Sequence, residues 1–307
     1  MIAIVAAALA AAAIVTPHLL RLDRAPAGIA SAIWLSALLL RALAALATAV
    51  AVEVFVPTTG LLEPLSDWCL RAEGTILSGH GAIDVVLALP ALVLAGSLAI
   101  VIAGLYRASR RVQALLRDAV IGEGPAGSLV VADGALLVAV AGLRRPRVVV
   151  SAGALLALDD AELLAALDHE RGHIALRHRY VLVAGELARA VARFLPGTAA
   201  AARELLFSLE RDADRYALDR RHDPAVLASA ICKSATQAAP PALALGGGVV
   251  ARRARLLLEG AAPGAHLGLI ALAPVMVALV IASAIALPFA AHAGYHESHR
   301  GRVQCTL

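Results

Sequence analysis

The sequence predicts a mainly α-helical membrane protein with four transmembrane helices and a cytoplasmic α+β domain, which lies between the third and the fourth helix in the chain. The composition is the first reason, because 60% of the residues are hydrophobic and only 16% are charged, whereas soluble domains are about half apolar and a quarter charged. The second reason is the presence of stretches that reach the roughly 20 apolar residues needed to cross a bilayer. These stretches are Ile2–Leu20, Ile29–Val56, Ala82–Leu105 and Leu267–Ala290.

The apolar stretches divide the chain into four parts. Residues 1–106 hold three helices and short loops, residues 107–265 form the polar domain, residues 266–290 form the last helix, and residues 291–307 form a short extracytoplasmic tail. The first stretch has the length of a signal peptide. It lacks a basic beginning and a cleavage site of small residues before a polar start, so we interpret it as a membrane helix.

Basic residues determine the expected orientation of these helices. They follow the first and third stretches and precede the fourth, so the positive-inside rule places both termini outside and the domain in the cytoplasm of a multi-pass cell-membrane protein. The residues are Arg21, Arg24, Arg107, Arg110, Arg111, Arg117, Arg252, Arg253 and Arg255. Arg300 and Arg302 favour the opposite orientation, but they lie in a short tail.

Several functional classes are disfavoured by what the composition lacks. The net charge of +4 is concentrated beside apolar stretches and has no interleaved aromatic residues, which argues against direct nucleic-acid binding. The three cysteines have no CxxC spacing, so they form no zinc knuckle. In this topology Cys69 and Cys305 both lie outside and can pair in a disulfide, while the alternative is that all three are free thiols.

Arg41 lies inside the second apolar stretch, where a charge is costly and usually faces a partner or a cavity. The alternative is that this long segment tilts or breaks near Arg41 and the side chain reaches the membrane interface. A transporter would need polar residues in several spans, and Arg41 and Glu53 stand out in only one.

The polar domain begins with strands and continues with helices. Short β-branched runs within residues 129–151 predict two or three strands. Asp159 and Glu162 form a capping box at the start of a helix that we expect to continue through His178. Further helices are expected at Val181–Leu195, at Thr198–Arg220 and from Pro224 to Pro240, followed by a flexible loop at Gly246–Gly248.

The stretch "LDHERGHIALRHRY", Leu167–Tyr180, carries the chemistry. His169 and His173 are four residues apart, so on a helix they project from one face and can bind one zinc ion. Glu170 lies beside the first histidine, where it can take a proton from a zinc-bound water during attack on a carbonyl. The sequence therefore predicts a catalytic Zn²⁺ site with Glu170 as general base.

A third protein ligand is expected from the helix that reads "LERDADRYALDRR". Glu210 is the candidate ligand, and Asp214, one turn later, is expected to accept the spare N–H of a ligand histidine. The alternative is that both acids pair with neighbouring arginines (Arg203, Arg211 or Arg215) on a solvated face. His178 is displaced around the expected helix and is a poor direct ligand.

These motifs resemble the gluzincin arrangement of integral membrane zinc peptidases, in which HExxH is followed by ExxxD. Arg145–His178 is similar to the BlaR/MecR type of sensor and antirepressor peptidase, and the motifs are also related to HtpX-like peptidases. The resemblance implies a gluzincin-type peptidase domain between the third and fourth membrane helices. The chain ends soon after the last span, so we expect no penicillin-binding sensor domain.

The sequence thus predicts a membrane-embedded zinc metalloendopeptidase that cleaves a protein substrate on the cytoplasmic side. The resemblance implies a signalling role in which the partner is a cytoplasmic transcriptional repressor. The alternatives are an HtpX-like quality-control protease and a catalytically silent signalling scaffold.

Overall fold

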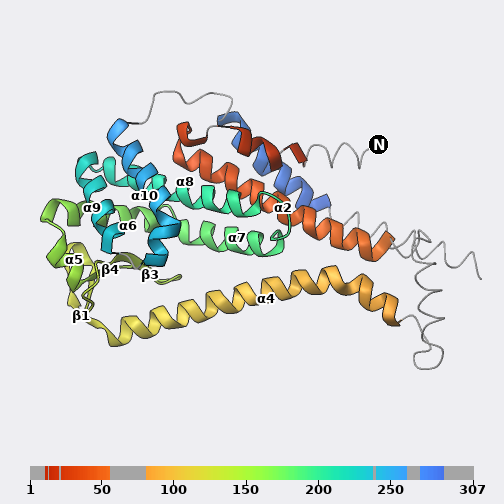
Figure 1. Cartoon of the computed structure of the whole chain (residues 1–307), viewed down its shortest axis with the longest axis horizontal. Helices are drawn as coiled ribbons and strands as arrows, with labels where there is room; N and C mark the ends of the chain where they lie inside the picture. The colour runs from red at the N-terminus through yellow and green to blue at the C-terminus, as the bar shows by residue number, and fades with distance from the viewer. Residues whose placement is uncertain are drawn as a thin grey trace, which may run out of the picture.

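The structure is a computed structural model that describes residues 11–12, 14–20, 22–55, 81–237, 240–260 and 270–286 (Figure 1). The expectations for Cys69, Cys305 and the tail lie outside these residues, as does most of the first apolar stretch. Within the described residues the chain is mostly helical, with one small sheet of four strands.

Two described helices are long and apolar enough to cross a membrane. They are α2 (Ala27–Phe55) and α4 (Gly81–Asp118), with apolar windows at Ala27–Ala49 and Ala91–Asp118. A shorter apolar helix occupies Ile270–Ala286. Helices therefore lie where the second, third and fourth spans were expected, and two of them meet the length for a span within the part of the chain that the structure describes.

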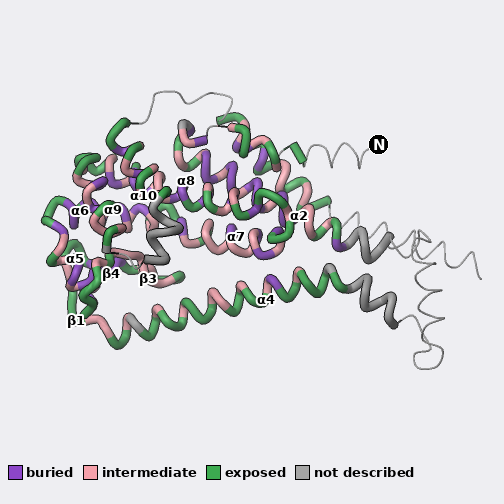
Figure 2. Tube along the Cα trace, viewed as in Figure 1, coloured by how far each residue is buried: buried purple, intermediate pink, exposed green. Residues whose placement is uncertain are grey.

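The two long helices have different surroundings. Ile33 and Leu38 of α2 are completely buried, and they pack with Leu205 and Leu209 in one apolar cluster. By contrast, α4 runs along one side of the molecule with most of its described surface exposed (Figure 2). As a result, α2 serves as a core helix of the folded protein, whereas α4 presents its apolar side chains outward.

The charged residue Arg41 lies on the buried side of α2. The helix α2 does not break at Arg41, and the side chain is only 1% exposed. Its guanidinium donates hydrogen bonds to the carbonyl oxygens of Ala37 (3.1 Å), Ile14 (3.0 Å) and Pro196 (3.4 Å). The interpretation in which Arg41 faces a protein partner is therefore correct, and the break with a side chain reaching the interface is wrong.

The small sheet has the strand order β1-β2-β4-β3. Strands β2 and β4 pair in parallel, and the other two pairs are antiparallel. Three of the strands fall within residues 129–151 as predicted, whereas the first was not anticipated. The bounds are β1 Val120–Glu123, β2 Leu129–Val131, β3 Val138–Ala141 and β4 Arg147–Ser151.

Helices follow the sheet and carry the rest of the domain. The predicted capping box is present, because Asp159 Oδ1 accepts from the Glu162 amide at 2.8 Å and Glu162 Oε2 accepts from the Asp159 amide at 3.0 Å. It fixes the start of α6, the helix that holds the histidine pair. The bounds are α5 Ala152–Ala157, α6 Asp160–Ala175, α7 His178–Val191, α8 Thr198–Leu218, α9 Pro224–Gln237 and α10 Pro240–Glu259.

Two sequence-based expectations about these helices are wrong. The helix with the histidine pair does not continue through His178, because Arg177 adopts a left-handed conformation (φ 58°) and the chain turns into α7. The expected loop at Gly246–Gly248 is part of α10. Three glycines weaken a helix by about 1 kcal/mol each relative to alanine, but α10 packs against α9, and Leu257 is buried there beside Leu227.

Candidate metal centre

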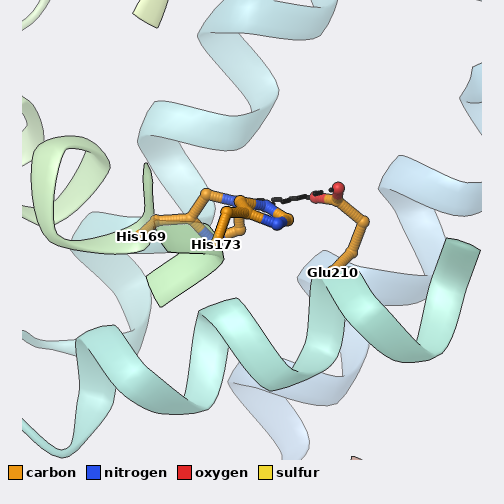
Figure 3. A group of neighbouring side chains, drawn as sticks. All are labelled: His169, His173 and Glu210. Atoms are coloured by element: carbon orange, nitrogen blue, oxygen red, sulfur yellow. Dashed lines mark hydrogen bonds and ion pairs between the residues drawn. The ribbon is translucent and has the colours of Figure 1, made fainter. Parts of the chain in front are cut away.

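Helices α6 and α8 bring the three predicted ligands together. His169 and His173 project from α6 toward Glu210 of α8 (Figure 3). The Nε2 atoms of the two histidines are 3.2 Å apart. The Glu210 carboxylate oxygens lie 3.4 Å from Nε2 of His169 and 3.5 Å from Nε2 of His173.

These separations fit a zinc ion. Zinc binds histidine nitrogen and carboxylate oxygen at about 2.0–2.2 Å in tetrahedral geometry, which places neighbouring ligand atoms about 3.3–3.5 Å apart. The three observed distances of 3.2, 3.4 and 3.5 Å lie close to that value. The two histidine nitrogens and the Glu210 carboxylate, whose two oxygens each face one of the nitrogens, are therefore close enough to share one zinc ion.

The other ring nitrogens support the same conclusion. Nδ1 of His169 lies 2.9 Å from Oδ1 of Asp214, and Nδ1 of His173 lies 2.9 Å from Nδ1 of His178. With the ring protons on Nδ1, both Nε2 atoms present lone pairs toward a carboxylate. A cation stabilises acceptor atoms that face one another in this way. A partner at Nδ1, such as Asp214 or His178 here, fixes the tautomer of a metal-binding histidine.

The two histidines differ in their affinity for a proton. Burial lowers the pKa of His169, but the Asp214 and Glu210 carboxylates outweigh burial and raise this pKa to about 9. Burial lowers the pKa of His173 to about 4. Although burial alone would raise the pKa of Glu210, His169 and Arg253 hold this pKa at about 2, so the third ligand is a carboxylate at neutral pH.

Glu170 follows His169 on α6, and it adjoins the edge strand β3. Burial, reinforced by the negative charge of Glu210, raises the pKa of Glu170 to about 7. The backbone amide of Val140 in β3 interacts with the Glu170 carboxylate. A carboxyl group with a pKa near the working pH can both accept and return a proton, as a general base and acid must.

Arg253 of α10 is a member of the site that the sequence did not reveal. Its side chain is 10% exposed, and its guanidinium lies 2.6 Å from Glu210 Oε2 and 2.6 Å from Asp214 Oδ1. The expected alternative partners on α8 are engaged elsewhere: Arg215 pairs with Asp219, and Arg211 donates to backbone carbonyls of Leu22 and Ala25. The sequence indicates Arg253 only as one of the basic residues that precede the fourth apolar stretch.

The chain was also compared with known proteins. Residues 107–239 match the model of Peptidase family M48. This part of the chain is therefore similar to the zinc metallopeptidases of family M48. The resemblance to BlaR/MecR and HtpX-like peptidases is thereby confirmed, since the family of zinc metallopeptidases includes both types.

The M48 segment contains every predicted site residue and ends before α10. The match therefore includes His169, Glu170, His173, Glu210 and Asp214, but not Arg253. Comparisons with curated proteins and with solved structures give no match. The match indicates a metallopeptidase, and the peptidases of family M48 depend on metal, typically zinc.

Proposed function

We propose that the chain is a membrane-bound zinc endopeptidase in which His169, His173 and Glu210 hold the metal, Glu170 is the general base and Asp214 orients His169. One observation carries this proposal: one ligand atom from each of His169, His173 and Glu210 lies within 4.8 Å of the other two. The M48 match supports the reaction class. The presence of Glu170 favours a turning-over enzyme over a silent scaffold, because a scaffold has no need of a base.

Each residue of the site has a separate role in the proposed peptide hydrolysis. A bound zinc ion would polarise the scissile carbonyl and make a water molecule more acidic. Glu170 takes the proton from the attacking water and then delivers it to the leaving amine. The Asp214 carboxylate lies 2.9 Å from Nδ1 of His169 and holds the ring, and Arg253 holds both Asp214 and Glu210 in place through its two ion pairs.

The edge strand β3 offers a place for the substrate backbone. It is the last strand in the order β1-β2-β4-β3, and Val140 within it adjoins Glu170. An extended peptide can add to such an edge through backbone hydrogen bonds. We propose that residues 136–140 align the substrate so that its scissile bond lies beside Glu170.

Membrane attachment is supported by the exposed side of α4. Leu92 and Ile100 are 60% and 64% exposed there, and members of the family are often membrane-bound. We propose that the domain faces the cytoplasm, as the basic residues predict, and that it cleaves a cytoplasmic regulatory protein such as a repressor. The similarity of Arg145–His178 to the BlaR/MecR type favours this role over HtpX-like quality control.

The proposal is tested by peptide cleavage with detergent-purified protein. Wild type, Glu170→Gln and the control Glu186→Gln are incubated with a peptide library, and the products are identified by mass spectrometry. Among the described residues, the hydrogen bonds and the ion pair of the Glu186 side chain are made with Arg189 on α7. We expect cleavage by wild type and the control, loss with Glu170→Gln, and loss with chelator that added zinc reverses. Equal cleavage by wild type and Glu170→Gln would refute the assignment.

A further inference from the structure

We propose that His178 and Asp212 form a pair that positions the ring of His173 for the metal. The inference rests on the proposed zinc site and assigns a role to two residues outside the ligand set. It is carried by a chain of contacts that runs from His173 through His178 to Asp212, and by the burial of His178.

The first contact joins the two histidine rings. His178 is 2% exposed, and its Nδ1 atom lies 2.9 Å from Nδ1 of His173. The rings meet edge to face, with centroids 4.9 Å apart. This contact exists because Arg177 ends the preceding helix in a left-handed conformation, which turns His178 back toward α6.

The direction of the hydrogen bond follows from the ligand atom. His173 faces Glu210 and His169 through Nε2, so metal binding requires a lone pair on that atom. The neutral ring of His173 then carries its proton on Nδ1 and donates it to Nδ1 of His178. His178 is left with its own proton on Nε2, because a neutral imidazole has one N–H.

Asp212 lies at the end of this chain. Oδ2 of Asp212 is 3.5 Å from Nε2 of His178, and this nitrogen is buried with no hydrogen-bond partner among the described residues. A shift of about half an ångström would give an ordinary hydrogen bond. A carboxylate behind a histidine makes the ring a better acceptor, so Asp212 strengthens the hold of His178 on His173.

The start of α2 fixes Asp212 from the other side. A Cβ atom added to Gly28 would lie 3.6 Å from the Asp212 carboxylate, so this acid packs against the first turn of α2. The positive end of the helix dipole favours an anion there. In addition, Arg211 anchors the neighbouring part of α8 to the carbonyls of Leu22 and Ala25. The metal ligand His173 is thereby linked to the start of a candidate membrane helix.

A matched pair of amide substitutions tests the role of His178. Asparagine places its oxygen near the position of Nδ1, whereas glutamine places it near the position of Nε2. Zinc affinity is measured by chelator competition on full-length protein in detergent, and the visible spectrum is recorded after cobalt substitution. Leu182→Ala is the control, because Leu182 lies on α7 in the apolar core.

We expect His178→Asn to retain zinc affinity within about threefold. His178→Gln should lose about 10- to 100-fold, and its cobalt spectrum should change. Asp212→Ala should give a smaller loss of affinity, and Leu182→Ala should lower thermal stability without affecting zinc.

Equal affinities and spectra in wild type, His178→Asn and His178→Gln would overturn the positioning role while leaving the zinc site intact. Equal losses in His178→Asn and His178→Gln would also overturn it, since that result indicates packing alone. A wild-type protein that binds no zinc would instead contradict the proposed function.

Discussion

The two histidines of the HExxH motif lie on the same face of α6, but their rings contact different neighbours. His169 is backed by the Asp214 carboxylate, which is itself paired with Arg253. His173 is backed by a second histidine, His178. Accordingly, the pKa of His169 is raised to about 9, whereas burial lowers the pKa of His173 to about 4. The helical spacing thus places the rings, and residues of other elements determine which nitrogen carries a proton.

The largest effect on peptide turnover is expected at Glu170, which contacts the Nδ1 atom of neither histidine. Glu170→Gln should reduce peptide turnover by about 10²- to 10⁴-fold, because it removes the proton acceptor. Zinc affinity should change little, since both histidines keep their partners. Turnover and chelator competition on the same preparation check this separation. A large loss of zinc in Glu170→Gln would show that the residue acts as a ligand.

The next effect concerns the carboxylate behind His169. Asp214→Asn should weaken zinc binding by about 10- to 100-fold, because Asp214 orients the ring and raises its basicity. Asp219→Asn is the matched control, since Asp219 lies at the end of α8 and its side chain is 59% exposed. Unchanged zinc affinity in Asp214→Asn would mean that His169 needs no partner.

The protons released when zinc binds should distinguish His169 from His173 directly. In the metal-free protein the His169 ring has a pKa of about 9 and is protonated and cationic at lower pH. The His173 ring has a pKa of about 4 and is neutral at higher pH. Zinc binding near pH 8 should therefore displace one proton from His169, and affinity should fall about tenfold per pH unit below 9. Calorimetry in two buffers of different ionisation enthalpy measures the release. Asp214→Asn should reduce it, and an unchanged value would contradict this origin.

The same shift has a consequence for stability. His169 has a raised pKa in the folded state, so its charge stabilises the metal-free fold below its unfolded pKa of 6.5. That contribution is lost as pH rises toward about 9. Urea unfolding of chelator-treated protein should show the decrease between these values, and Asp214→Asn should flatten it.

The smallest effect, a change in the free energy of unfolding, is expected at Arg177 in the turn that precedes His178. Arg177 has φ 58°, which costs a side-chain-bearing residue about 1 kcal/mol that glycine avoids. Arg177→Gly should raise the unfolding free energy by up to about 1 kcal/mol and leave zinc affinity unchanged. Denaturant unfolding with chelator competition tests both parts. A drop in zinc affinity would show that the arginine itself supports the site.

Much of the site follows from the sequence because local rules determine it. The capping box sets the start of α6, and helical spacing brings His169 and His173 to one face. The same spacing puts Glu210 and Asp214 together on α8. These inferences need no knowledge of tertiary contacts, and the structure brings the proposed ligands together.

The residues that sequence reasoning missed depend on contacts between distant elements. Arg253 reaches Asp214 from 39 positions away, and nothing in its arginine-rich surroundings distinguishes it from a topology marker. His178 was assigned to a continuous helix, on which it would face away from the ligands. Only the left-handed residue Arg177 reverses that direction, and no glycine or asparagine indicated the turn.

The most direct test of the central claim is the metal content of detergent-purified protein. Wild type and Glu210→Gln are prepared side by side under metal-replete conditions and measured by elemental mass spectrometry. The proposed site predicts one equivalent of zinc in wild type and a sharp decrease in Glu210→Gln. No zinc in wild type, or the same zinc content in both proteins, would contradict the assignment of His169, His173 and Glu210 as its ligands.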